Sequence, residues 1–157
     1  MAAETEQKGQ YMSHDPPQHY PRVTPYVLYE DVAGALEWLT TAFGFRERLR
    51  FTAPDGSVTH AEMQIGDDGV VMLGQPGPEY RSPRRLGACT FYVHVYVDDV
   101  DAHCARAQAA GASILGEPSD EAYGDRRYDA EDLEGHRWSF AQHLRDVPPQ
   151  EWGATRA

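Results

Sequence analysis

The chain has 157 residues, of which 41% are hydrophobic, and this size suits one domain or two small halves that share a core. Its 25 acidic and 14 basic residues give a formal charge of −11, which argues against nucleic acid and anionic membrane surfaces as partners. No apolar run approaches the roughly 20 residues of a membrane span, and the first residues lack the apolar core of a signal peptide, so we expect a cytoplasmic protein.

The first half of the chain is predicted to form a strand, a helix and three further strands. Residues 1–21 are polar and contain several prolines, which indicates a flexible tail. A strand is expected over 23–29, followed by a helix over 32–43 in which apolar residues recur at helical spacing. Three strands are then expected from alternating or short apolar runs between turn signals, over 45–53, 57–66 and 70–73.

The second half follows a linker at 75–87, which is rich in Pro, Gly and Arg and is long enough to serve as a binding loop. A strand is expected over 90–97, where Tyr92, His94 and Tyr96 share one face and valines occupy the other. The remaining elements are a helix over 100–110, strands over 113–117, 123–132 and 137–143, a loop over 118–121 and a tail over 145–157.

The same signals occur in the same order in both halves. In each, an alternating strand ends at an acidic corner, Tyr29-Glu30-Asp31-Val32 or Val97-Asp98-Asp99-Val100, where the acidic residues suit a helix N-terminus. We infer an internal duplication in which each half has the order β-α-β-β-β. The predicted fold is therefore α+β, with two tandem modules that form a curled mixed sheet with a central cup and helices on the outer face.

This duplicated pattern resembles the vicinal oxygen chelate superfamily, which has the glyoxalase, bleomycin-resistance and extradiol dioxygenase fold. The phrases that carry the resemblance are VTPYVLYEDVAGALEWLTTAFGF, HAEMQIGDDGVVMLG, YVDDVDA and YGDRRYDAEDLEGHRW. Within the superfamily the chain is most similar to PhnB-like proteins. The resemblance implies one domain over 22–144, with module one at 22–74, the linker at 75–87 and module two at 88–144.

The resemblance also implies where a divalent metal would bind, because the first and last strands of each module supply ligands in metal-dependent members. These positions fall on Thr24, Met72, Tyr92 and Ser139. Hydroxyl and thioether groups are poor ligands for the hard or borderline divalent ions that these sites hold. We therefore expect neither a metal nor another cofactor.

The side chains that strand alternation places on the cup face are aromatic, with some polar groups among them. This mixture suits a small-molecule pocket, and its aromatic walls suit planar rings. The predicted ligand-binding residues are Tyr26, His60, Glu62, Met72, Tyr92, His94, Trp138 and Ser139.

Three alternatives remain open from the sequence. His60, Glu62 and His94 would form a displaced metal site if the chain were a metal-dependent lyase or dioxygenase, or they would only pair locally on an exposed face. In a third interpretation the chain is a regulatory or interaction protein whose own side chains fill the cup. The resemblance further implies a homodimer.

Several arginines offer another candidate site. Arg126 and Arg127, with Arg81, Arg84 and Arg85, would surround an anionic ligand if they gathered in space, because guanidinium binds carboxylate and phosphate in a forked geometry. In a chain of charge −11, pairing with the many carboxylates is the favoured interpretation.

Overall fold

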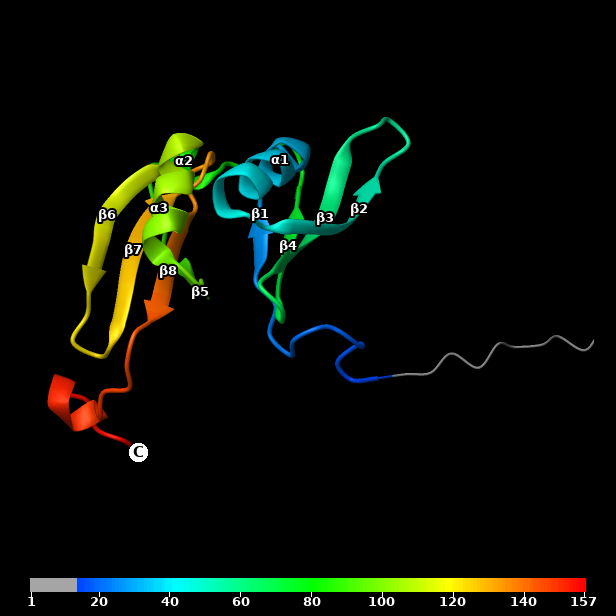
Figure 1. Cartoon of the computed structure of the whole chain (residues 1–157). Helices are drawn as coiled ribbons and strands as arrows, with labels where there is room; N and C mark the ends of the chain where they lie inside the picture. The colour runs from blue at the N-terminus through cyan, green and yellow to red at the C-terminus, as the bar shows by residue number, and fades with distance from the viewer. Residues whose placement is uncertain (1–13) are drawn as a thin grey trace, which may run out of the picture.

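The chain folds into two modules that contain the same elements in the same order (Figure 1). The computed structural model describes residues 14–157. The first module consists of β1 (Tyr26–Leu28), α1 (Val32–Phe43), β2 (Arg46–Thr52), β3 (Val58–Ile65) and β4 (Gly69–Gly74). The second consists of β5 (Tyr92–Tyr96), α3 (Val100–Ala109), β6 (Ser113–Asp120), β7 (Asp125–Glu131) and β8 (Arg137–His143). A short helix, α2 (Pro83–Leu86), lies in the connection, and a 3-10 helix, η1 (Pro149–Trp152), follows β8.

Each module forms its own four-stranded mixed sheet. The strand orders are β1-β4-β3-β2 and β5-β8-β7-β6, so the second sheet repeats the first. The first strand of each module pairs in parallel with the last, which requires the crossover through a helix, and the other neighbours are antiparallel. This confirms the predicted α+β fold of tandem β-α-β-β-β modules. The strands lie in two sheets that do not close into a barrel (Figure 1).

The acidic corners begin the two long helices, as predicted. Asp31 Oδ1 accepts a hydrogen bond from Gly34 N at 3.0 Å, and Asp99 Oδ1 accepts one from Ala102 N at 2.9 Å. Both carboxylates thus satisfy amides that the first helical turn leaves unpaired. At 12 residues α1 is too short to cross a bilayer, and no other helix within residues 14–157 has the length and apolar composition to do so.

One aromatic cluster joins the two modules. Phe43, at the end of α1, has its ring centroid 4.7 Å from that of Phe140 and 5.7 Å from that of Trp138 on β8. Phe45 lies 5.4 Å from Trp138. All four side chains are at most 3% exposed, so the helix-covered faces of the two sheets share a single core.

A buried carboxylate reinforces this junction. Asp132 is 1% exposed, and its Oδ2 accepts hydrogen bonds from Tyr29 Oη at 2.7 Å and Trp138 Nε1 at 3.0 Å. Its Oδ1 accepts from the backbone amides of Glu134 and His136, each at 3.0 Å. The corner after β1 is therefore tied to the turn between β7 and β8 of the other module.

Two strand boundaries differ from the sequence prediction by three residues, and the others by at most two. The strand expected from residue 23 begins at Tyr26, and Val23 is 81% exposed, outside the sheet. The loop expected over 118–121 is wrong, because β6 continues to Asp120. Pro118 is accommodated because β6 is the edge of its sheet and its pairing is irregular between Gly116 and Ser119, where no ladder amide is needed.

The structure describes the N-terminal tail in part and the C-terminal tail in full. Most of the predicted flexible tail, residues 1–13, lies outside the described residues, whereas residues 14–21 are described and one side chain among them contacts the first sheet. The C-terminal tail expected over 145–157 contains the short helix η1. Its Trp152 packs edge-on against Tyr123 with ring centroids 5.9 Å apart.

Candidate functional site

Each sheet has one face covered by its helix, and we call the opposite face the open face. Strand alternation and register place Tyr26, Met72 and Glu62 in one row across β1, β4 and β3 on the first open face. His60 lies next to Glu62 on the same side of β3, with Phe51 of β2 opposite it. Tyr26 is 52% and Phe51 59% exposed, but Glu62 is only 6% exposed. An acidic group is thus buried beside exposed aromatic rings.

A chain of polar contacts crosses this first open face. Tyr26 Oη lies 2.7 Å from His60 Nδ1, and His60 Nε2 lies 3.5 Å from Glu62 Oε1. The second carboxylate oxygen of Glu62 accepts a hydrogen bond from Tyr20 Oη at 2.6 Å. This bond, together with partial burial, raises the pKa of Tyr20 above its usual value. The phenol therefore remains a proton donor over the physiological range.

The second open face is aromatic along the edge strand β5. Tyr92 and Tyr96 are 56% and 61% exposed, and the ring of His94 meets that of Tyr96 edge-on at 5.1 Å. His94 is in register with Ser139 of β8. Ser139 is 1% exposed, and its hydroxyl has no hydrogen-bond partner within residues 14–157. This face therefore offers exposed rings above a buried polar group.

Asp125, which the sequence did not indicate as a site residue, holds two side chains at one end of the second open face. It is 3% exposed, its Oδ2 accepts a hydrogen bond from Tyr96 Oη at 3.0 Å, and its Oδ1 lies 2.7 Å from His143 Nδ1. The bond to Asp125 raises the pKa of Tyr96, and bonds to Asp125 and Asp146 raise the pKa of His143. Asp125 meets His143 because β7 pairs with β8, so no local sequence pattern indicated this contact.

The predicted ligand-binding residues fall into two groups, one on each open face. The first face carries Tyr26, His60, Glu62 and Met72, and the second carries Tyr92, His94 and Ser139. Among the described residues, no hydrogen bond or ion pair joins one face to the other within the chain.

The structure corrects the prediction that Trp138 lies on the cup face. Its side chain is 1% exposed and lies in the aromatic core, on the helix-covered face of β8. Neighbouring residues of a strand point to opposite faces, so Trp138 and Ser139 cannot both line the cup. Ser139 takes the open face, and the indole N–H of Trp138 is used by Asp132.

The displaced metal site is not assembled within one chain. His60 and Glu62 are neighbours on the first sheet, whereas His94 lies on the second. In the part of the chain that the structure describes, no three His, Cys, Asp or Glu side chains are arranged to hold an ion. Instead, His60 pairs locally with Glu62 and Tyr26.

The side chains at the superfamily's metal positions do not suit a divalent ion. Met72 offers a thioether, which is a soft ligand, and Ser139 offers a buried neutral hydroxyl. The hydroxyl of Thr24 lies 3.4 Å from the carbonyl oxygen of Pro21, to which it donates a hydrogen bond. Tyr92 would have to ionise in order to bind. These four side chains therefore do not fit the metal that the superfamily's usual site would hold.

A cleft of about 690 Å³ lies between the edge strand β5 and the first module. It brings the second open face close to the turn between β3 and β4 and to the segment that enters β1. The residues that line it are Pro21, Val23, Pro25, Ile65, Gly66, Asp67, Asp68, Gly69, Val70, Val93, His94, Val95, Tyr96 and Asp98. Both His94 and Tyr96 thus face a space large enough for a small organic molecule.

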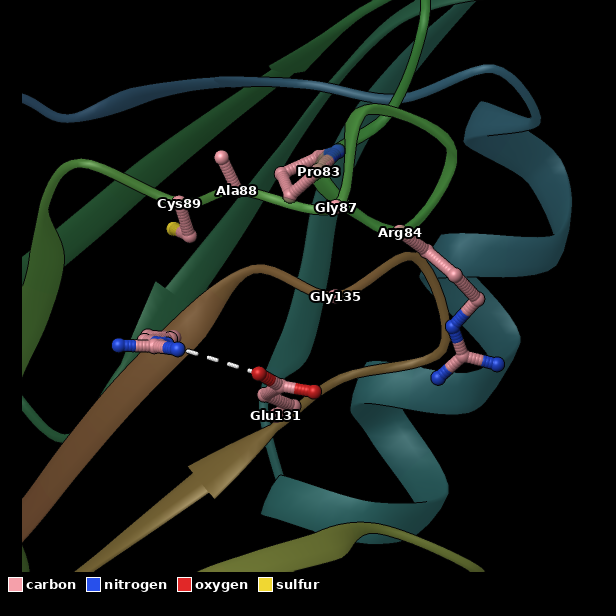
Figure 2. Close-up of a pocket in the computed structure, with 8 residues that line it drawn as sticks. Pro83, Arg84, Gly87, Ala88, Cys89, Glu131 and Gly135 are labelled. Carbon is pink, nitrogen blue, oxygen red and sulfur yellow. Dashed lines mark ion pairs between the residues drawn. The ribbon is translucent and has the colours of Figure 1, made fainter.

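A second, smaller pocket of about 250 Å³ lies beside α2, at the end of the second open face where Glu131 and Arg137 are in register with Tyr92 (Figure 2). Figure 2 shows the side chain of Arg84 extending away from Cys89 and Glu131, and its Nη2 lies 3.3 Å from Asp132 O. Arg137 Nε pairs with Glu131 Oε1 at 3.5 Å. The charges around this pocket are therefore largely used in pairs within the protein.

Arg126 and Arg127 of the candidate anion site are also paired. Arg126 binds Asp101 at 3.0 Å and Asp120 at 2.8 Å, and Arg127 binds Asp129 at 2.8 Å. The two guanidinium groups hold neighbouring carboxylates rather than framing a common anion site. The favoured interpretation of the arginines, local pairing, agrees with this arrangement.

The duplicated β-α-β-β-β fold with a ligand-sized cleft at an open face defines a class of proteins built from paired modules. The chain belongs to the Glyoxalase/Bleomycin resistance protein/Dioxygenase superfamily, whose family model matches residues 20–140. These comparisons show membership of the superfamily, and they do not assign the chain to its PhnB-like members.

Relatives and solved structures agree with this membership. Uncharacterised proteins of Mycobacterium bovis and Mycobacterium tuberculosis are 34% identical over 132 residues, which cover 81% of this chain and 86% and 77% of theirs. The crystal structure of TioX from Micromonospora sp. ML1 is similar at a TM-score of 0.63 with 37% identity, covering 77% of this chain and 97% of TioX. A glyoxalase/bleomycin resistance protein/dioxygenase from Nocardioides, at 0.60 and 19% identity over 82% of this chain and 87% of its own, shares the fold.

Proposed function

We propose that this protein binds a small, planar aromatic molecule on its open sheet faces. The observation that carries the proposal is the exposure of Tyr26, Tyr92 and Tyr96, each more than half exposed on a face where hydrogen-bonding groups lie within reach. Large aromatic side chains exposed together beside fixed polar groups are typical of ligand sites. Glu62 and Ser139 supply buried polar groups that would orient a ligand.

We further propose that binding proceeds without a metal at the superfamily's usual positions. Thr24, Met72, Tyr92 and Ser139 supply neutral or soft donors, which supports a binding protein over a metal-dependent lyase or dioxygenase. The aromatic ring of Tyr92 at one of these positions offers a stacking surface instead.

We also propose that the protein is a cytoplasmic homodimer, and the exposed rings support the dimer. A second copy that covers the open faces would bury Tyr26, Tyr92, Tyr96 and Phe51 and complete a closed site. Light scattering is expected to give a mass near twice the 17.6 kDa of one chain. Cys89 and Cys104 are both free thiols, which suits a reducing compartment.

The binding proposal is tested by screening planar aromatic compounds for thermal stabilisation of the untagged protein and measuring the affinity of the best one by calorimetry. Tyr92→Ala is expected to weaken that affinity about tenfold, because it removes one stacking surface. Phe91→Ala is the matched control, since Phe91 is an equally exposed aromatic residue, at 54%, immediately before β5. Equal losses in the two variants, or no stabilising compound, would contradict the proposal.

The metal-free part is tested separately by elemental analysis. Wild-type protein is expected to carry no stoichiometric divalent metal after purification in metal-containing buffer. A stoichiometric metal that is lost in the His60→Ala/Glu62→Ala variant would overturn this part and establish the displaced site on the first open face.

A further inference from the structure

The segment before β1 places one aromatic side chain on the first open face. Tyr20 Oη donates to Glu62 Oε2 at 2.6 Å, and the guanidinium carbon of Arg48 lies 4.4 Å from the centroid of the Tyr20 ring. A phenol is thus held by a carboxylate at its hydroxyl and by a cation over its face.

The groups around this phenol are built into the sheet. Glu62 is in the middle of β3, is 6% exposed, and is flanked by His60, whose Nε2 lies 3.5 Å from its Oε1. Arg48 lies at the point where the pairing of β2 with β3 shifts register, between Glu47 and Leu49. Its Nη1 is buried and has no hydrogen-bond partner within the described residues, so the guanidinium has donor capacity left over.

By contrast, little else fastens the segment that carries Tyr20. The other described hydrogen bonds of residues 14–22 are local and reach no strand: they run from Tyr20 N to Pro17 O at 3.0 Å, from Arg22 Nη2 to Asp15 O at 3.5 Å and from Thr24 Oγ1 to Pro21 O at 3.4 Å. Val23, which follows, is 81% exposed. The phenol of Tyr20 is therefore the point at which this segment is attached to the sheet, and a competitor for that point would release it.

We propose that Tyr20 is a displaceable internal ligand, and that the external ligand of this subsite is an uncharged planar ring that bears a hydroxyl or ring N–H donor. This inference rests on the proposed function and specifies its ligand. An ionised carboxylate only accepts hydrogen bonds, so whatever replaces Tyr20 must donate one to Glu62. The guanidinium over the ring favours an electron-rich aromatic face. Because Arg48 and Glu62 already balance in charge, a neutral ligand leaves no charge uncompensated.

The test uses p-cresol, which reproduces the Tyr20 side chain, and 4-methylanisole, which has the same ring without a donor. Calorimetry or ligand-detected NMR on the full chain measures both affinities for wild type, Tyr20→Phe and Tyr20→Ala. Removing the internal competitor in Tyr20→Ala is expected to tighten p-cresol binding about tenfold over wild type. Tyr20→Phe, which keeps the ring and loses the hydroxyl, is expected to lie between the two.

The donor requirement is tested in the Tyr20→Ala background. There, p-cresol is expected to bind about tenfold tighter than 4-methylanisole, and adding Glu62→Gln is expected to reduce this preference to about twofold or less. A preference that survives Glu62→Gln would overturn the assignment of Glu62 as the acceptor.

Failure of this inference is distinguishable from failure of the proposed function. If aromatic compounds from the screen stabilise the protein but wild type and Tyr20→Ala bind p-cresol equally, Tyr20 is not a competitor and the inference is wrong while the proposed function stands. If no aromatic compound binds either protein, both are wrong.

Discussion

At the scale of single residues, the most consequential side chain outside the open faces is Asp132. Its carboxylate accepts four hydrogen bonds at 1% exposure, and two of the donors, Tyr29 and Trp138, lie in different modules. Burial, followed by the charge of Asp132, raises the pKa of Tyr29 well above its usual value, so this phenol remains a donor. The junction therefore depends on one buried carboxylate that accepts four hydrogen bonds and has no ion-pair partner within residues 14–157.

Asp132→Ala is expected to lower the free energy of unfolding by about 3 kcal/mol, because it leaves several buried donors without an acceptor. Urea denaturation followed by tryptophan fluorescence measures the change. Asp129→Ala is the matched control: its carboxylate pairs with Arg127 near the surface, so its loss is expected to cost less than about 1 kcal/mol. Equal costs for the two variants would show that Asp132 does not hold the junction.

His143 gives the fold a pH-dependent contribution. Hydrogen bonds to Asp125 and Asp146 raise the pKa of His143 in the folded protein, so the folded state holds this proton more tightly than the unfolded chain. The resulting stabilisation is complete below the usual pKa of histidine and is lost as the pH rises through the raised folded-state value.

His143→Gln is accordingly expected to destabilise the protein more at about pH 5.5 than at about pH 8.5, on either side of the histidine transition. Urea denaturation at the two pH values measures this, and an NMR titration of His143 gives its pKa directly. Asp125→Asn is expected to bring that pKa back toward the ordinary value. A His143→Gln effect that is the same at both pH values would contradict the assignment.

At the scale of secondary structure, the sequence predicted an element well where its boundaries depend only on neighbouring residues. Helix α1 has the predicted bounds because its capping Asp31 and its terminating Gly44 act on adjacent residues. Helix α3, which was also predicted, buries Val100, Cys104 and Ala107, which recur at helical spacing. The end of β6 was missed because the tolerance of a sheet for Pro118 depends on the strand being an edge, which is a property of the assembled sheet.

The C-terminus of α1 is completed by the other module. Arg106 of α3 donates from Nε to Thr41 O at 2.8 Å and from Nη2 to Thr40 O at 2.9 Å, and Thr40 O also accepts from Gly44 N at 3.2 Å, so these carbonyls at the helix end are paired. Gly44, the C-cap residue, has φ +73° and lies so close to Arg106 that an added Cβ would be 2.7 Å from its Nη1. The left-handed backbone favours glycine here, and an added Cβ would also make the Arg106 guanidinium shift from its hydrogen bonds.

Gly44→Ala is therefore expected to destabilise the protein by about 2 kcal/mol, combining left-handed backbone strain with the clash against Arg106. Gly111→Ala is the matched control, since its φ is +91° but an added Cβ would meet nothing within 4 Å, and it is expected to cost about 1 kcal/mol. In an Arg106→Ala background the two costs should become equal. Urea denaturation of the five variants measures the cycle, and a difference that persists without Arg106 would refute the contact.

At the scale of the whole molecule, the sequence predicted which residues lie on the open faces better than it predicted what meets them. Alternation along β1, β3 and β5 assigns Tyr26, His60 and Tyr92 to these faces, because alternation is a property of each strand alone. The contact of Tyr20 with Glu62 joins residues 42 positions apart and leaves no periodic trace in the sequence. How the two faces combine into a cup is equally non-local.

The contacts between the two modules indicate how the two open faces would combine into a cup. Within the chain the modules meet through the aromatic core, Asp132 and the Arg106 cap, and the described hydrogen bonds do not link one open face to the other. Tyr26 and Tyr92 of one chain therefore remain exposed, at 52% and 56%. We expect a closed cup to take its first face from one copy and its second face from the other.

Mixed dimers test this expectation. Two differently tagged chains, one carrying Tyr26→Ala and the other Tyr92→Ala, are co-expressed, and the mixed dimer is isolated with both tags. If each cup combines faces from both copies, one cup carries both substitutions and the other carries none, so calorimetry should find about half of the sites at wild-type affinity. If each cup forms within a chain, every cup carries one substitution and no site reaches wild-type affinity. Homodimers of each single variant supply the reference affinity of a cup with one defect.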